Sequence, residues 1–322
     1  MIQRLLAALA AAIVFGVVEL ALWLHRAQDW AAGGALAAAA CVPLLAHAAI
    51  LGQQFAIGAW LRRRSRPDLR PGLAAALRAW SGEIVASLRT FGYAQIRYAS
   101  RPLPSGADAG RVPVLLVHGY FCNRGIWHAF ARRLAARGHP LESVNLEPVF
   151  GPIDDYVPVI AAGIERLRAR TGAARIAVVA HSMGGLAVRA FIAARGGEAL
   201  AAVVTLGTPH RGTWLARYGY GRNVAQMRLD SDWLRALADR ESAQESARAG
   251  VPFTVILSLH DNMVAPQTIQ TLEGARTIEL TARGHVELAY DREAWARTIE
   301  AIDTVARSGC PASTAGTPSG PH

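Results

Sequence analysis

The sequence predicts an α/β domain with a mostly parallel sheet, preceded by two membrane-spanning helices. From residue 112 onward, short apolar and β-branched runs alternate with helical patterns of about 10–15 residues, which is typical of parallel strands joined by right-handed crossovers. One of these runs passes into a helix through a turn of only a few residues. The first 61 residues, in contrast, are almost wholly apolar, which indicates membrane spans.

The apolar N-terminal region divides into two candidate spans. Leu5 to Leu24 is apolar apart from Glu19, and about 20 helical residues at 1.5 Å each cover the roughly 30 Å hydrocarbon core of a bilayer. A second apolar run extends from residue 31 to about 61. The alternative for the first segment is a secretory signal peptide, but its apolar region is usually shorter, about 7–15 residues. We expect transmembrane helices over about 5–24 and 31–61.

The arginines predict how this hairpin is oriented. Arg4 precedes the first span and Arg26 alone lies in the connecting loop. Five more arginines crowd the exit of the second span: Arg62, Arg63, Arg64, Arg66 and Arg70. Because basic residues stay on the cytoplasmic side, both ends of the hairpin and the following domain are predicted to be cytoplasmic, at a bacterial inner membrane.

A basic juxtamembrane segment, residues 62–110, joins the hairpin to the domain. Within it, Leu73 to Tyr98 has apolar residues at helical spacing with charges between them. This pattern fits an amphipathic helix at the lipid headgroups, or equally a helix packed on the domain. Residues 101–110 are rich in proline and glycine and are predicted to be a linker.

Composition excludes several classes of function. The hydrophobic fraction of 52% and the mean hydropathy of +0.20 are raised by the N-terminal region, and every basic residue behind the net charge of +10 is arginine. Abundant alanine, arginine and glycine suggest a coding bias, and the sequence has no nucleic-acid-binding motif, so we expect no nucleic-acid partner. Cys41, Cys122 and Cys310 are scattered and have neither disulfide nor metal-ligand spacing.

The short turn carries a serine. Ile176 to Ala180 is a buried-strand run, Gly185 to Phe191 continues with helix formers, and Ser182 lies between them. Small residues two positions before and after the serine, Ala180 and Gly184, avoid collisions in such a sharp turn. The pattern resembles the nucleophile elbow G-x-S-x-G of the α/β-hydrolases, with Ala180 replacing the first glycine, and bacterial lipases have A-H-S-M-G-G here. The resemblance implies that Ser182 is a nucleophile.

A second resemblance to these hydrolases lies at the strand Val112–Val117, which ends in His118-Gly119. In lipase-like α/β-hydrolases such a dipeptide opens the loop that gives one oxyanion-hole amide. The resemblance implies that the oxyanion hole consists of the backbone amides of Tyr120 and Met183. It assigns His118 to holding that loop.

The acid and the base follow in the order that the fold requires. Asp261 comes after the strand Phe253–Leu259, where this fold places its carboxylate, and His285 lies in the loop before the last helix. His210, in a segment similar to the T-L-G-T-P-H of bacterial lipases, precedes the acid, so we interpret it as a loop-shaping residue. We therefore predict a triad of Ser182, Asp261 and His285.

The segment before the strand Phe253–Leu259, residues 211–250, is predicted to be a small helical cap over the site. Asp230 and Asp232 belong to this cap and suit a solvated surface. The α/β-hydrolase domain is predicted to cover 111–307, followed by a disordered tail over 308–322 that is rich in proline, glycine, serine and threonine.

Together the resemblances imply a membrane-anchored serine carboxylic ester hydrolase similar to bacterial triacylglycerol lipases and esterases. The expected substrate is a lipid or lipophilic acyl ester, and the mechanism requires no metal or organic cofactor. An acyltransferase or thioesterase on the same triad is the alternative among enzymes. A membrane-bound scaffold on a hydrolase fold is the alternative outside them.

Overall fold

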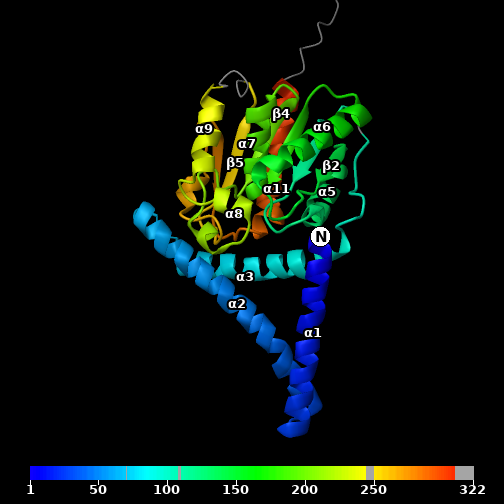
Figure 1. Cartoon of the computed structure of the whole chain (residues 1–322), viewed down its shortest axis with the longest axis vertical. Coiled ribbons are helices and arrows are strands. Elements are labelled where there is room, and N and C mark those ends of the chain that lie inside the picture. The colour runs from blue at the N-terminus through cyan, green and yellow to red at the C-terminus, as the bar shows by residue number, and fades with distance from the viewer. Residues whose placement is uncertain (70, 108–109, 244–249, 309–322) are drawn as a thin grey trace, which may run out of the picture.

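The computed structural model describes residues 1–69, 71–107, 110–243 and 250–308 of the chain. Almost all of the predicted tail, and residues 244–249 of the predicted cap, lie outside these ranges. Figure 1 shows an α/β domain above two long helices that form a V, α1 (Ile2–Ala27) and α2 (Ala32–Ser65). A third helix, α3 (Leu73–Arg89), lies across the base of the domain, between it and the V.

The described part of the domain contains one sheet of six parallel strands in the order β2-β1-β3-β4-β5-β6. The strands are β1 (Val114–Val117), β2 (Leu141–Val144), β3 (Ile176–His181), β4 (Leu200–Leu206), β5 (Phe253–Ser258) and β6 (Arg276–Leu280). Every residue of β1, β3, β4 and β5 is buried, because helices cover both faces of the sheet. This double burial is why these strands are continuous apolar runs in the sequence.

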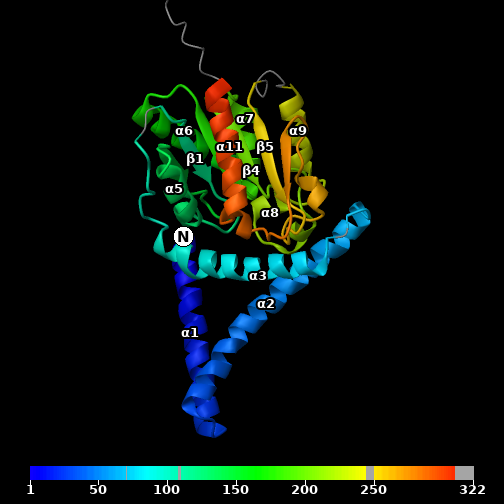
Figure 2. The same cartoon turned by 180° about the vertical axis from the view of Figure 1, so that it is seen from behind.

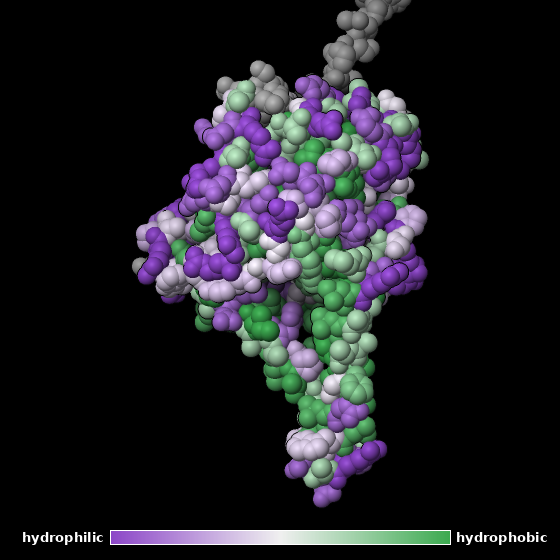
Figure 3. Space-filling model, viewed as in Figure 1, coloured by the Kyte–Doolittle hydropathy of each residue, from purple (hydrophilic) through white to green (hydrophobic). Residues whose placement is uncertain are grey.

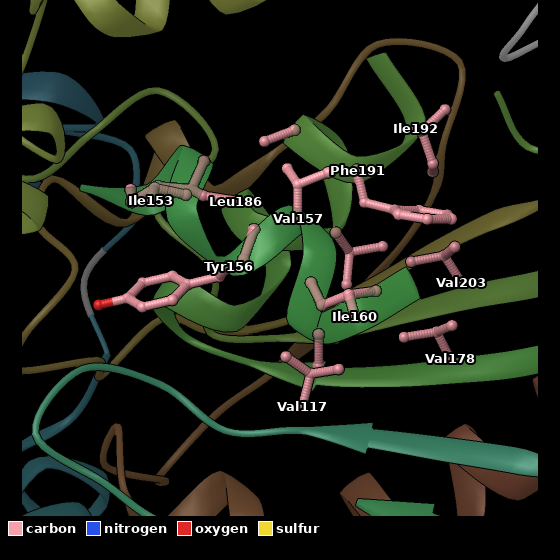
Figure 4. Close-up of a cluster of buried hydrophobic side chains, with 14 of the residues drawn as sticks. Val117, Ile153, Tyr156, Val157, Ile160, Val178, Leu186, Phe191, Ile192 and Val203 are labelled. Atoms are coloured by element: carbon pink, nitrogen blue, oxygen red, sulfur yellow. The ribbon is translucent and has the colours of Figure 1, made fainter. Parts of the chain in front are cut away.

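Two pairs of helices cover the two faces. Helices α6 (Val157–Thr171) and α7 (Met183–Arg195) pack on one face, in the cluster shown in Figure 4. Helices α5 (His128–Ala135) and α11 (Arg292–Ser308) pack on the other, and Figure 2 shows α11 running along it. Successive residues of β1 alternate between the two cores, as the pleat of a strand requires: Leu115 belongs to the first and Leu116 to the second.

Shorter helices surround the sheet. They are the 3₁₀ turns η2 (Arg124–Trp127), η3 (Ile153–Tyr156), η4 (Trp214–Tyr218), η5 (Gln267–Gln270) and η6 (Glu287–Ala289), the π-helical turn η1 (Thr90–Ala94), and α4 (Gln95–Arg97), α8 (Arg222–Gln226) and α9 (Asp232–Ala243). The predicted cap is indeed helical, but its two halves differ in position. Helix α8 lies near the base of the domain, whereas α9 stands beside the sheet and is tied to α7 by a buried Arg189–Glu241 ion pair of 2.6 Å.

The N-terminal helices are longer than the predicted spans. Both are long and apolar enough to cross a membrane, with mean hydropathies of 2.5 and 2.0, and few of their residues are buried. Figure 3 shows that hydrophobic side chains gather on this V, below a largely hydrophilic domain. Of the two alternatives for the segment after residue 73, the structure shows packing on the domain through one face of α3. Its opposite face exposes Leu73, Leu77 and Val85.

Candidate active site

The predicted site residues lie at the carboxyl ends of the parallel strands. Ser182 directly follows β3, Asp261 comes shortly after β5, and His285 lies in the loop after β6. The carboxyl ends of these parallel strands point toward the base of the domain, where α3 lies (Figure 1). Crevices at this edge are where open α/β sheets bind ligands, because the loops there converge from different strands.

The backbone at Ser182 has the geometry of a sharp strand-to-helix turn. Its φ of 55° and ψ of −130° place a residue with a side chain in a strained region, which typically costs about 1–3 kcal/mol. Gly184 shows why small neighbours are needed, because a Cβ there would lie 2.6 Å from the carbonyl oxygen of His118. The turn sets the serine at the first turn of α7, and the amide of Ser182 donates to Leu206 O at 2.8 Å.

The three predicted triad residues form a continuous hydrogen-bonded chain. His285 Nε2 lies 2.9 Å from Ser182 Oγ, and His285 Nδ1 lies 2.9 Å from Asp261 Oδ2. The other carboxylate oxygen, Oδ1, accepts from the amides of Met263 at 2.8 Å and Val264 at 2.7 Å. The carboxylate is therefore fixed on both sides, and one of its oxygens faces the imidazole.

Comparisons with known proteins identify the fold. The model of a family described as PGAP1-like alpha/beta domain matches residues 154–286. The crystal structure of a mature Bacillus licheniformis lipase superposes with a TM-score of 0.55 at 16% identity, over 64% of this chain and 97% of that one. Aspergillus fumigatus lipase B gives a TM-score of 0.53 at 20% identity, over 63% and 55%. The chain has the α/β-hydrolase fold.

Two sequence relatives are triacylglycerol lipases. A triacylglycerol lipase of Burkholderia plantarii is 32% identical over 165 residues, which are 47% of this chain and 44% of that protein. One of Pseudarthrobacter phenanthrenivorans is 34% identical over 121 residues, 34% of this chain and 37% of that protein. The chain thus spans less than half the length of these curated relatives, and the N-terminal helices lie outside the matched family domain.

The negative charges around His285 favour its acceptance of a proton. Burial disfavours its charged form, but the neighbouring Asp261 carboxylate, its hydrogen bond and the charge of Glu83 outweigh burial and raise the pKa of His285 above its ordinary value. His285 is only 5% exposed and Asp261 1% exposed, so their interaction is shielded from water.

The loop that carries Tyr120 lies against the serine. A Cβ at Gly119 would lie 2.7 Å from Ser182 Cβ, so the backbone of this loop touches the elbow. Met183 is the first residue of α7, where backbone amides have no partner within the helix. The positions of Tyr120 and Met183 are compatible with an oxyanion hole, whose role stays a prediction.

Two buried histidines hold the loops around the triad. The Nε2 of His118 accepts from the amide of Leu146 at 3.0 Å, so its Nδ1 donates to Gly119 O at 2.9 Å. His181 Nε2 donates to the carbonyl of His285 at 3.0 Å. Burial lowers the pKa of His118 to about 4 and that of His181 to about 3, so both are neutral at pH 7. The resemblance of the sequence to lipases predicts the loop role of His118, but no motif points to His181.

The residues that compete with His285 and Asp261 for the roles of base and acid lie elsewhere in the fold. His210 is buried beside Thr205 Oγ1 at 3.1 Å, and its carbonyl accepts from Arg189, so it shapes the loop after β4. The Asp232 side chain is 98% exposed and pairs with Arg235.

A cavity of about 570 Å³ opens at Ser182 and His285, which is within the usual size of small-molecule sites. Its walls are mostly apolar and come from several parts of the chain. Leu215, Tyr218 and Val224 belong to the first half of the cap, Tyr120 and Phe121 to the loop after β1, and Ile50 and Leu51 to helix α2. Helix α2 therefore forms part of the pocket beside the proposed nucleophile.

Contacts from α2 also reach the loops that carry Asn262 and His285. Gln54 Oε1 accepts from Asn262 Nδ2 at 2.9 Å, and Asn262 Oδ1 accepts from the amide of His285 at 3.0 Å. In the sequence, Gln54 is a polar residue within the apolar run of residues 31–61. A glutamine deep in a candidate span is a usable signal, because polar side chains in such segments need a partner.

Proposed function

We propose that the protein is a membrane-anchored serine carboxylic ester hydrolase that cleaves lipid or lipophilic acyl esters. One observation carries the proposal: the continuous Ser182–His285–Asp261 hydrogen-bonded chain, with 2.9 Å at both links, at the mouth of an apolar cavity. The likeness to triacylglycerol lipases over about half of the chain supports the ester class.

The mechanism follows from the geometry. A serine hydroxyl is a weak nucleophile, so His285 takes its proton as Oγ attacks the ester carbonyl carbon. Asp261 stabilises the imidazolium that forms. The amides of Tyr120 and Met183 donate to the oxyanion, where a single donor is worth roughly 3–4 kcal/mol. The imidazolium then protonates the leaving alcohol, and water releases the acid from the acyl-enzyme by the reverse sequence of proton transfers.

An apolar acyl group is the substrate feature that the cavity favours. Its lining is largely aliphatic and aromatic, and only a few polar side chains converge near Ser182. A hydrophilic acyl group would lose its hydration there without gaining hydrogen bonds. The exposed apolar surfaces of α1 and α2 favour a bilayer as the source of such a substrate.

The orientation in the membrane is part of this proposal. Arginines at both ends of the hairpin favour a cytoplasmic α/β domain at the inner membrane. Reporter fusions near residue 100 test it. A cytoplasmic reporter is expected to be active there, and activity only of a reporter that works outside the cytoplasm would reverse the orientation.

Substitution of the serine tests the reaction. Ser182→Ala is expected to lower hydrolysis of p-nitrophenyl acyl esters by roughly 10⁶-fold, and a fluorophosphonate probe should label the wild type and not the variant. Undiminished hydrolysis in the variant would reject the nucleophile. Preferential transfer of the acyl group to an added alcohol, or a preference for coenzyme A thioesters, would favour the acyltransferase or thioesterase alternative.

A further inference from the structure

A buried carboxylate on α3 contacts the loop of the catalytic histidine. Glu83 is 1% exposed, although it belongs to the juxtamembrane helix and lies outside the matched family domain. Its Oε1 accepts from the amide of Val286 at 3.0 Å, and its Oε2 accepts from the amide of Glu287 at 2.9 Å. These are the two residues that directly follow His285.

The fit of Glu83 into this loop is tight. A Cβ at Gly284 would lie 2.3 Å from Glu83 Oε2, so the residue before His285 must be small. Glu83 therefore fixes the backbone on one side of the histidine, while Asn262 accepts from the amide of His285 itself at 3.0 Å. The imidazole is held through its backbone as well as through Asp261.

Charged and titratable groups surround Glu83 on all sides. His285 and Asp261 lie on the side of the site, and the Arg78–Glu287 ion pair of 2.7 Å lies at the rim. On the side of α2, His47 contacts Ser87, one turn along α3 from Glu83. Burial raises the pKa of Glu83 to about 7, although both amides and the charge of His285 favour its ionised form.

A buried carboxylate would be unfavourable at position 83 if the side chain only had to pack α3 against the domain. A buried carboxylate loses its hydration, and helix α3 could be held on the domain by an apolar side chain at lower cost. A carboxylate is useful at this position because it accepts two backbone hydrogen bonds at once and adds negative charge near an imidazolium.

We propose that Glu83 is a positioning residue for His285: it holds the histidine loop in register with Ser182, so that the juxtamembrane helix α3 is required for turnover. The part of the inference that concerns turnover rests on the proposed hydrolase function.

Kinetics of the full-length protein in detergent form the first arm of the test. Glu83→Gln keeps the shape but removes the charge and one acceptor, so kcat on p-nitrophenyl acyl esters should fall about 10-fold, with KM within about twofold. Loss of negative charge should also move the acid limb of the kcat/KM profile to lower pH, because the pKa of His285 falls. Glu83→Ala should lower kcat further.

Hydrogen exchange forms the second arm and does not depend on a substrate. In Glu83→Ala, the amides of Val286 and Glu287 should exchange faster, while amides of the central strands β3 and β4 keep their protection. The matched control is Glu165→Gln, which removes a carboxylate whose side chain is 69% exposed on α6 and should change neither readout.

Each outcome decides the proposal. Wild-type kcat, pH profile and local exchange in both Glu83 variants would overturn it. Equal loss of protection throughout the sheet would show that Glu83 only maintains the fold, and would overturn it as well. If the wild type hydrolyses no ester but Glu83→Ala still loosens residues 286–287, the loop-holding role stands and the hydrolase function fails.

Discussion

The Asp261 carboxylate does two different tasks with its two oxygens. Oδ1 accepts two backbone amides of its own loop, and Oδ2 faces His285 Nδ1. The first set of contacts holds the side chain, and the second orients the imidazole toward Ser182. These two tasks can be separated by a change at one atom.

Asp261→Asn makes this separation. The amide oxygen can keep the contacts with Met263 and Val264, whereas the NH₂ group then faces Nδ1 and stabilises the wrong tautomer of His285. We expect kcat to fall roughly 10⁴-fold with little change in stability. Steady-state kinetics and thermal unfolding measure this. Asp232→Asn on the exposed start of α9 is the control, and retention of full activity by Asp261→Asn would contradict its assignment as the triad acid.

The pH dependence of hydrolysis follows from His285. The base must be neutral to accept a proton, and its pKa lies above the ordinary value because Asp261 and Glu83 stabilise the charge more than burial disfavours it. We expect kcat/KM to rise with pH and to level off above a midpoint higher than about 6.5. A profile that is flat between pH 5 and 8 would contradict a histidine base.

The sequence predicts three triad residues that the structure brings into hydrogen-bond distance, but it does not predict the residues that hold them. Ser182, Asp261 and His285 each follow a recognisable apolar strand, and their order along the chain limits the choice. Glu83 lies 204 positions from its partner Glu287. A contact over that separation arises only when the chain folds, so a local pattern cannot reveal it.

Among the elements, α2 combines two environments. Its apolar composition predicts a span ending near residue 61, but the helix continues to Ser65. Arg62 explains the extension, because it is 7% exposed and its Nη1 donates to the carbonyl of Leu259 at 2.5 Å. The end of the helix is thus set by contact with the α/β domain, which hydropathy does not predict. The divided cap has the same cause, since α9 is placed by its packing on α7.

Because α2 forms a pocket wall, it should influence which acyl chains fit. Leu51 is 7% exposed and lines the cavity, whereas Leu45 on the same helix is 68% exposed. Leu51→Trp fills part of the cavity, so kcat/KM should fall about 10-fold or more for long acyl chains and much less for acetate or butyrate esters.

Leu45→Trp adds the same side chain away from the cavity and serves as the matched control. Its kcat/KM should keep the wild-type dependence on chain length. If p-nitrophenyl esters of increasing chain length gave parallel profiles for Leu51→Trp and Leu45→Trp, α2 would not contact the acyl group.

At the scale of the whole molecule, the parallel sheet could be predicted but the order of its strands could not. Continuous apolar runs separated by helical patterns require burial on both faces, which a parallel sheet provides. The central position of β3, between β1 and β4, depends on pairing across long crossovers. The same topology buries His118 and His181 at the ends of neighbouring strands, where burial disfavours the protonated form of both.

These two histidines should make the folded protein sensitive to acid. Their pKa values of about 4 and about 3 lie below the unfolded value of about 6.5, so the unfolded chain binds protons that the folded chain excludes. Their contribution to stability is therefore full above about pH 6.5 and falls as the pH drops, by up to roughly 2 kcal/mol for each histidine at pH 5. The raised pKa values of His285 and Glu83 act in the opposite direction, because their contributions are present at low pH and are lost as the pH rises through the folded pKa. Denaturant unfolding in detergent at pH 7 and pH 5 measures the balance.

His181→Gln, whose amide can still donate to the carbonyl of His285, should reduce the loss of stability between these two pH values by about 2 kcal/mol. An unchanged loss in this variant would show that His181 is not buried in its neutral form.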